Sequence, residues 1–125
     1  MMVFVALMLC LLLASCGGGG SPAPPGPSPP SNPNTVTITA AGVSPKELTV
    51  PPGTRVLFVN SDNRRHEMTS DPHPEHTDCT EINSVGALSP GQGRETGNLV
   101  DVRTCGFHDH GEPDNSGLKG RIIIR

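Results

Sequence analysis

The sequence contains no Trp and no Tyr, and only three Phe stand among its 125 residues. A chain of this length, with 14 Pro and 15 Gly, has room for one small domain, which excludes large enzymes, dinucleotide-binding folds and repeat arrays. The chain also has no excess of basic residues, because its formal net charge is −3. Without a basic patch to release counterions from phosphates, we expect no nucleic-acid partner.

Charged residues are absent before Lys46, and the first segment of the chain is apolar. Residues 1–15 form a run that has the length of a signal-peptide core and is too short to span a bilayer comfortably. The run ends at Ala14-Ser15-Cys16, which resembles the lipobox of bacterial lipoproteins, although no Lys or Arg precedes it. This resemblance implies an exported protein whose acylated Cys16 anchors it in membrane lipid, on the periplasmic or cell-surface side. An ordinary signal peptide that happens to end in Cys is the alternative.

Residues 16–34 consist mainly of Gly, Pro and Ser. Such a composition cannot bury a core, and its Pro-rich half favours an extended conformation. We therefore expect a disordered linker at 16–34 and one folded domain at 35–125.

From residue 35 the sequence alternates polar and apolar side chains, as a half-buried strand does. Further short segments between turn residues predict strands at 47–50, 55–60, 65–69, 99–104 and 120–124, and the segment at 55–60 is a more continuous apolar run. No window shows a convincing helical period. The pattern predicts an all-β domain with the architecture of a β-sandwich.

The five His residues fall into two groups, and these groups dominate the functional interpretation. The first group holds His66, His73 and His76, and the second holds His108 and His110. Clustered imidazoles are typical ligands of transition metals, and two residues separated by one position point to the same side of an extended chain. We therefore predict a metal site, although each of these His residues could alone be a solvated loop residue.

Cys105-Gly106-Phe107-His108 forms a Cys-X-X-His pair, followed by Leu118, Gly120 and a final strand. With the Pro-Gly turn at 51–53 and Asn60 ahead of His66, this order resembles the cupredoxins over about residues 36–125. The resemblance implies a Greek-key β-sandwich in which His66, Cys105 and His108 bind copper and transfer electrons with a redox partner protein. Leu118 departs from it, because this side chain stands at the axial Met position and cannot coordinate. Arg103 also departs from it, because an aromatic residue is common there.

A third departure concerns Cys79, the other Cys of the folded domain. Exported domains favour disulfides, so Cys105 is either a copper thiolate or bridged to Cys79, and we favour the bridge. The segment 70–78, Ser-Asp-Pro-His-Pro-Glu-His-Thr-Asp, also resembles a cupredoxin-like subgroup with a late His-X-His. That resemblance implies an all-imidazole site for copper, or alternatively zinc, that holds or delivers the metal to a copper carrier. Its ligands would be His66, His108, His110 and one or both of His73 and His76.

Two other functions compete with a copper-binding protein. Gly106-Phe107-His108-Asp109-His110 resembles a motif of copper/zinc superoxide dismutases, but only 15 residues follow it and none is His. A structural cell-surface β-sandwich with incidental metal binding is the other alternative. Because no convincing nucleophile arrangement is present, we expect a protein that is not an enzyme. Carboxylates beside the histidines, such as Asp71 and Asp109, could accept hydrogen bonds from imidazoles, but loop carboxylates are usually only solvated.

Overall fold

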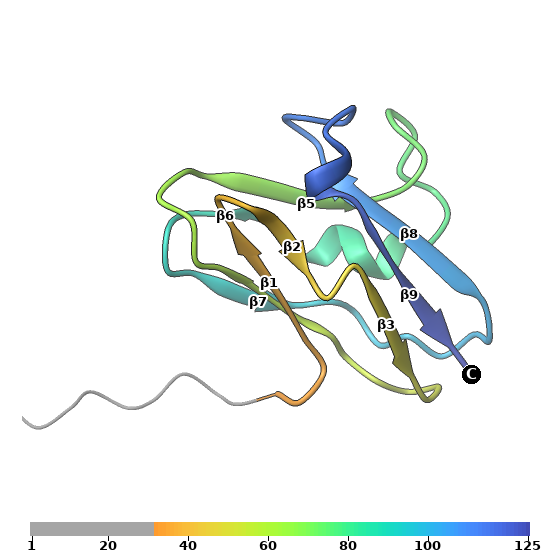
Figure 1. The fold of residues 1–125 in the computed structure, drawn as a ribbon. Helices are drawn as coiled ribbons and strands as arrows, with labels where there is room; N and C mark the ends of the chain where they lie inside the picture. The colour runs from red at the N-terminus through yellow and green to blue at the C-terminus, as the bar shows by residue number, and fades with distance from the viewer. Residues whose placement is uncertain (1–31) are drawn as a thin grey trace, which may run out of the picture.

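The computed structural model describes residues 32–125, which form two β-sheets packed into a sandwich (Figure 1). The predicted signal peptide at 1–15, the acylation site Cys16 and most of the predicted linker lie outside the described residues. These assignments therefore stay predictions. Within the described part, no helix is both long enough and apolar enough to cross a bilayer.

The two sheets are built from nine short strands. One sheet has the order β2-β1-β4-β7 and comprises β1 (Thr35–Thr39), β2 (Gly42–Ser44), β4 (Leu57–Asn60) and β7 (Gly93–Glu95). The other has the order β3-β9-β8-β5-β6 and comprises β3 (Glu47–Val50), β5 (His66–Ser70), β6 (Gly86–Leu88), β8 (Thr104–Asp109) and β9 (Gly120–Ile124). The helical content of residues 32–125 is two short 3₁₀ turns, η1 (Thr80–Ser84) and η2 (Ser116–Leu118).

The period-two pattern of the sequence explains which residues form strands. In β1 the apolar Val36 and Ile38 are fully buried, while Thr35, Thr37 and Thr39, which alternate with them, are half-buried. In β9 Ile122 and Ile124 face the core in the same way. The all-β sandwich predicted from this alternation is confirmed.

One pair of Phe rings joins the two sheets across the core. Phe58 of β4 and Phe107 of β8 meet edge to face, with ring centroids 5.1 Å apart, in a geometry that aromatic pairs prefer. Both rings are fully buried. Phe107 also lies directly over Gly120, the first residue of β9 and its partner in the antiparallel pair.

We expect Gly120→Ala to lower the free energy of unfolding by about 2 kcal/mol, because the added Cβ has no free space. That atom would overlap Phe107 Cζ and lie 2.7 Å from the carbonyl oxygen of Lys46. Urea unfolding measures the loss. Gly93→Ala in β7 is the matched control, because its Cβ would meet its neighbours at an ordinary 3.4 Å. Equal stability of the two variants would contradict the prediction.

The strand predicted at 99–104 is wrong. The strand lies at Thr104–Asp109 instead, and the preceding segment makes a single bridge between Thr54 and Leu99. Val100 and Val102 alternate with polar residues as a strand would, but they are 51% and 73% exposed. Because neither Val side chain packs against the core, their alternation does not indicate a strand of a sheet.

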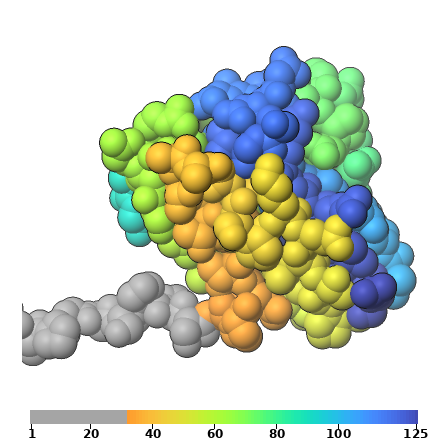
Figure 2. All heavy atoms as spheres, viewed as in Figure 1, coloured from red at the N-terminus to blue at the C-terminus, as the bar shows by residue number. Residues whose placement is uncertain are grey.

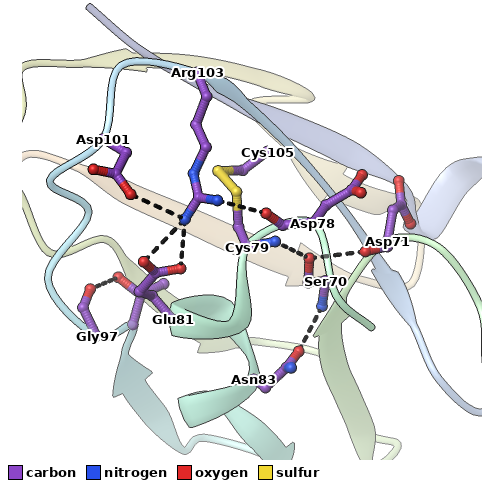
Figure 3. Close-up of a disulfide and its surroundings, with 11 residues drawn as sticks. Ser70, Asp71, Asp78, Cys79, Glu81, Asn83, Gly97, Asp101, Arg103 and Cys105 are labelled. Carbon is purple, nitrogen blue, oxygen red and sulfur yellow. Dashed lines mark hydrogen bonds and ion pairs between the residues drawn. A yellow bond between two sulfur atoms is a disulfide. The ribbon is translucent and has the colours of Figure 1, made fainter. Parts of the chain in front are cut away.

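A disulfide joins Cys79 to Cys105 and fixes the loop after β5 to strand β8 (Figure 3). Both Cys residues are fully buried. Cys79 N–H donates a hydrogen bond to Ser70 Oγ at the end of β5, at 2.8 Å. On the other side Arg103 binds both carboxylate oxygens of Glu81 at 3.0 Å and the Asp78 carbonyl at 2.8 Å. The segment 70–81 is therefore held against β8 by one covalent bond and several polar contacts.

Candidate metal centre

Two loops and the end of strand β8 bring four of the five His residues together at one end of the sandwich. The loop at 71–79 follows β5 and carries His73 and His76, and the loop that follows β8 begins at His110. These loops stand beside each other at the upper edge of the molecule (Figures 1 and 2). Their approach is fixed by the backbone, because His110 N–H donates to the Glu67 carbonyl of β5 at 2.7 Å.

Three imidazoles converge here with their nitrogens facing one another. One ring nitrogen each from His73, His76 and His110 lies within 4.8 Å of the other two. Nitrogens bound about 2 Å from a shared ion lie between about 3 and 4 Å apart, so small rotations of these side chains complete the geometry. His73 and His110 are exposed and can make those rotations. We call these three residues the imidazole triad.

His76 is the most constrained member of the imidazole triad. Its Nδ1 donates a hydrogen bond to the Ser70 carbonyl oxygen at 2.8 Å, so the proton of the neutral ring lies on Nδ1. The lone pair of Nε2 is then available to a metal ion. That Nε2 lies 3.0 Å from His110 Nδ1. The backbone of His76 has φ 54°, in the left-handed region that a residue other than Gly seldom adopts. Strained conformations of this kind concentrate at functional sites.

His73 is prepared for metal binding by its surroundings. Its pKa lies below the ordinary value, chiefly through desolvation and then through repulsion from the nearby His110, His108 and His76. Asp114 opposes this shift. A lowered pKa keeps the imidazole neutral near pH 7, so its lone pair is available to a metal ion.

His108 lies beside the imidazole triad but is not part of it. Its ring stacks on His76 with centroids 5.1 Å apart, and it is almost fully buried. Its Nδ1 binds Asp71 Oδ1 at 2.6 Å, and its Nε2 lies 3.4 Å from Thr69 Oγ1. β8 ends at Asp109, so His110 lies in the loop that follows, and the rings of His108 and His110 both pack against His73 and His76.

His66 lies apart from the imidazole triad and binds two carboxylates. Its Nδ1 is 2.6 Å from Asp109 Oδ2, and its Nε2 is 2.9 Å from Asp62 Oδ2. All three side chains are buried. Both ring nitrogens of His66 are thus engaged by carboxylates, so this predicted ligand belongs to a buried hydrogen-bonded cluster.

This cluster acts on Asp62 as well. The hydrogen bond from His66 is the largest cause of a pKa of Asp62 below its ordinary value. Desolvation opposes it, whereas the backbone N–H of Asn63 and the guanidinium of Arg64 lower the pKa further. The charged form of Asp62 is thus favoured in the folded state.

The direction of this shift predicts a pH-dependent effect of Asp62→Asn. A carboxyl whose pKa is lowered by folding stabilises the protein above its unfolded pKa of about 3.9, and this contribution is lost as the pH falls through the folded value. The difference in unfolding free energy between wild type and Asp62→Asn should therefore be full above about pH 5 and shrink below about pH 4. Urea unfolding at several pH values measures it. Asp101→Asn, an exposed carboxyl, serves as control, and a gap independent of pH would contradict the prediction.

The blue-copper ligand set does not fit these residues. Cys105 is in a disulfide and offers no thiolate, so the prediction of a copper thiolate is corrected and the competing bridge to Cys79 is confirmed. Leu118, at the expected axial position, is buried and has no donor atom. Sequence reasoning gave no role to Asp62, and it named Asp71 and Asp109 without choosing either. Asp71 and Asp109 lie close to His residues in the sequence, and this proximity was the only sign that they would contact imidazoles.

Comparison with known proteins shows which fold carries this arrangement. The chain matches no protein-family model and no curated protein sequence. Among solved structures it is similar to a purple cupredoxin from Nitrosopumilus maritimus, with 19% identity and a TM-score of 0.57, over 73% of this chain and 98% of that one. It is also similar to plastocyanin from Dryopteris crassirhizoma, with 17% identity and a TM-score of 0.56 over 73% and 99% of the two chains. A Cu(I) amicyanin variant matches at 17% identity and a TM-score of 0.56, over 73% and 80%. The domain therefore has the cupredoxin fold.

Proposed function

We propose that this protein binds copper through the imidazole triad and holds or delivers it, instead of serving as a blue-copper electron carrier. The observation that carries this proposal is the convergence of three imidazole nitrogens, from two loops, within 4.8 Å. Imidazole suits Cu(II), and Cu(II) is bound more tightly than other divalent first-row metals at a given site. The solved cupredoxins of the same fold make copper the first metal to test.

The ligand set favours a protein that holds copper over one that transfers electrons. A blue-copper carrier needs a thiolate, and both Cys residues within the described part of the chain, Cys79 and Cys105, are bridged to each other. His73 and His110 are exposed, so an ion bound between them is accessible to a partner that gives or takes it. The disulfide also suits an oxidising compartment, in keeping with the predicted export and lipid anchoring at Cys16.

Calorimetric titration with Cu(II) tests the proposal. The full chain is used with Cys10→Ser and Cys16→Ser, so that no free thiol competes for the metal. We expect one Cu(II) per chain at submicromolar affinity, weaker Zn(II) binding, and no intense thiolate-to-copper band in the visible spectrum.

Two results would overturn the proposal. Micromolar or weaker binding of Cu(II) would favour a structural β-sandwich with incidental metal binding. An intense thiolate band would show that Cys105 is free to coordinate.

A further inference from the structure

A fourth imidazole lies next to the imidazole triad and yet stays out of it. The ring centroid of His108 is 5.1 Å from that of His76 and 5.5 Å from that of His73. At such distances a change of side-chain rotation would bring it to an ion held by the triad. A separate contact must therefore hold the His108 ring away from the imidazole triad.

Asp71 provides the explanation. Its carboxylate holds His108 Nδ1 at 2.6 Å, while His108 Nε2 is directed at Thr69 Oγ1 on the neighbouring strand. A carboxylate–histidine pair of this kind fixes the orientation and tautomer of the ring. Asp71 is itself anchored, because its backbone N–H donates to the Gly106 carbonyl at 3.0 Å and its carbonyl accepts from Asp78 N–H at 2.9 Å.

Gly106 is what lets Asp71 take this position. The Asp71 carboxylate lies over Gly106 of strand β8, and a Cβ at Gly106 would overlap Asp71 Oδ2 and come 2.9 Å from Asp71 Cγ. Gly106 and His108 are two residues apart on β8, so they share a face of the strand. Because Gly106 has no side chain, the Asp71 carboxylate has room to pass over β8 and reach His108.

Beside His73 the surface is hollowed where a ligand could approach. Asp71, Pro72, Pro113, Asp114 and Lys119 line this hollow together with His73, and its volume is about 570 Å³. Lys119 brings one positive charge and Asp71 and Asp114 bring two negative charges, so the lining by itself does not attract anions. A small monovalent anion can still pass beside Lys119, because a bound Cu(II) ion would supply the attraction.

The geometry points to a copper centre with one exchangeable coordination position, which Asp71 keeps open to a small anion by holding His108 away. This inference rests on the proposed function, because it concerns the copper ion that the triad would bind. Metal sites with three protein ligands usually carry water or another exogenous ligand in the fourth position. The anion would enter from the hollow beside His73 and replace that water.

Azide is the probe for this position. The Cu(II)-loaded full chain, with Cys10→Ser and Cys16→Ser, is titrated with azide and followed by azide-to-copper absorption and by pulsed electron paramagnetic resonance. In the wild type we expect saturable azide binding and three coordinated imidazoles. In Asp71→Ala, His108 is released to coordinate, so azide should bind about tenfold more weakly and a fourth imidazole should appear.

Three further variants make the test specific. Asp71→Ala with His108→Gln should restore azide binding, because the released ring is gone. Gly106→Ala should reproduce the Asp71→Ala result, because its Cβ displaces the same carboxylate. Glu75→Ala removes an exposed carboxylate from the same loop and should change nothing.

The outcomes separate this inference from the proposed function. Four coordinated imidazoles and no azide response in the wild type would overturn the open position. Azide binding that is unchanged in both Asp71→Ala and Gly106→Ala would overturn the role of Asp71. A failure of the wild type to bind Cu(II) at all would overturn the proposed function instead.

Discussion

Replacing His76 by Ala should weaken Cu(II) binding by about a hundredfold, the largest loss expected from any single His in the chain. His76 is the member of the imidazole triad whose donor atom is already fixed. Its Nδ1 bonds the Ser70 carbonyl, and Asn83 Nδ2 donates to its carbonyl oxygen at 2.9 Å. Because the ring is already oriented, binding a metal ion to it costs little side-chain entropy. Calorimetric titration of the variant against the wild type measures the loss.

His66→Gln is the matched control for this prediction. The structure gives both ring nitrogens of His66 to carboxylates, so the control should keep its Cu(II) affinity within about threefold while losing stability. The blue-copper interpretation predicts the reverse order. If His66→Gln abolished binding and His76→Ala did not, the metal would belong at the position that the sequence resemblance implied.

His66 also shows where sequence reasoning reaches its limit. Its place in a strand after Asn60 was predicted, since the strand expected at 65–69 is β5 at His66–Ser70. Its partner Asp109 is 43 positions away, and the two meet because β5 and β8 pair with Met68 opposite Asp109. A shift of the pairing by one residue would turn Asp109 to the other face of the sheet. Register is a property of the assembled sheet, so composition and spacing could not reveal that His66 is already engaged.

The strands themselves were more accessible to prediction. β1 and β3 follow from the alternation of apolar and polar residues, because one face of each is buried, whereas β9 follows from its run of three Ile. β2, β6 and β7 have three residues each, too few to show a period. The position predicted for β8 was wrong because residues on both of its faces are buried, which conceals any alternation. These residues are Cys105, Phe107, His108 and Asp109. The loop at 71–79 lies over Gly106 and His108 of β8, and this same loop carries His73 and His76 of the imidazole triad.

The grouping of the histidines was predictable, and the choice among them was not. Their clustering in the sequence indicated a shared site, and the structure does bring His73, His76 and His110 together. What separates His108 from them is the carboxylate of Asp71, 37 positions away, lying over a Gly. Only the path of the loop after β5 produces that contact.

Replacing both cysteines of the disulfide, in Cys79→Ala with Cys105→Ala, should lower the free energy of unfolding by about 3–4 kcal/mol. The bond closes a loop with a sequence separation of 26 residues, and its loss restores conformational freedom to the unfolded chain. A small domain with so few aromatic residues has little stability in reserve. Urea unfolding of the variant, of the oxidised wild type and of the wild type under reducing conditions measures the difference. Both the variant and the reduced protein should lose stability.

The same variant separates stability from metal binding. The loop at 71–79 is held to β8 by the disulfide and also by Arg103 and by the Asp71–Gly106 backbone bond. Where the double variant stays folded, His73 and His76 should therefore remain near His110, and Cu(II) affinity should fall by less than about tenfold. An equal loss in His76→Ala and in the disulfide variant would contradict this, because it would show that the bond, not the local hydrogen bonds, positions the triad. Unchanged stability in both the variant and the reduced wild type would show that the disulfide does not form in the native chain.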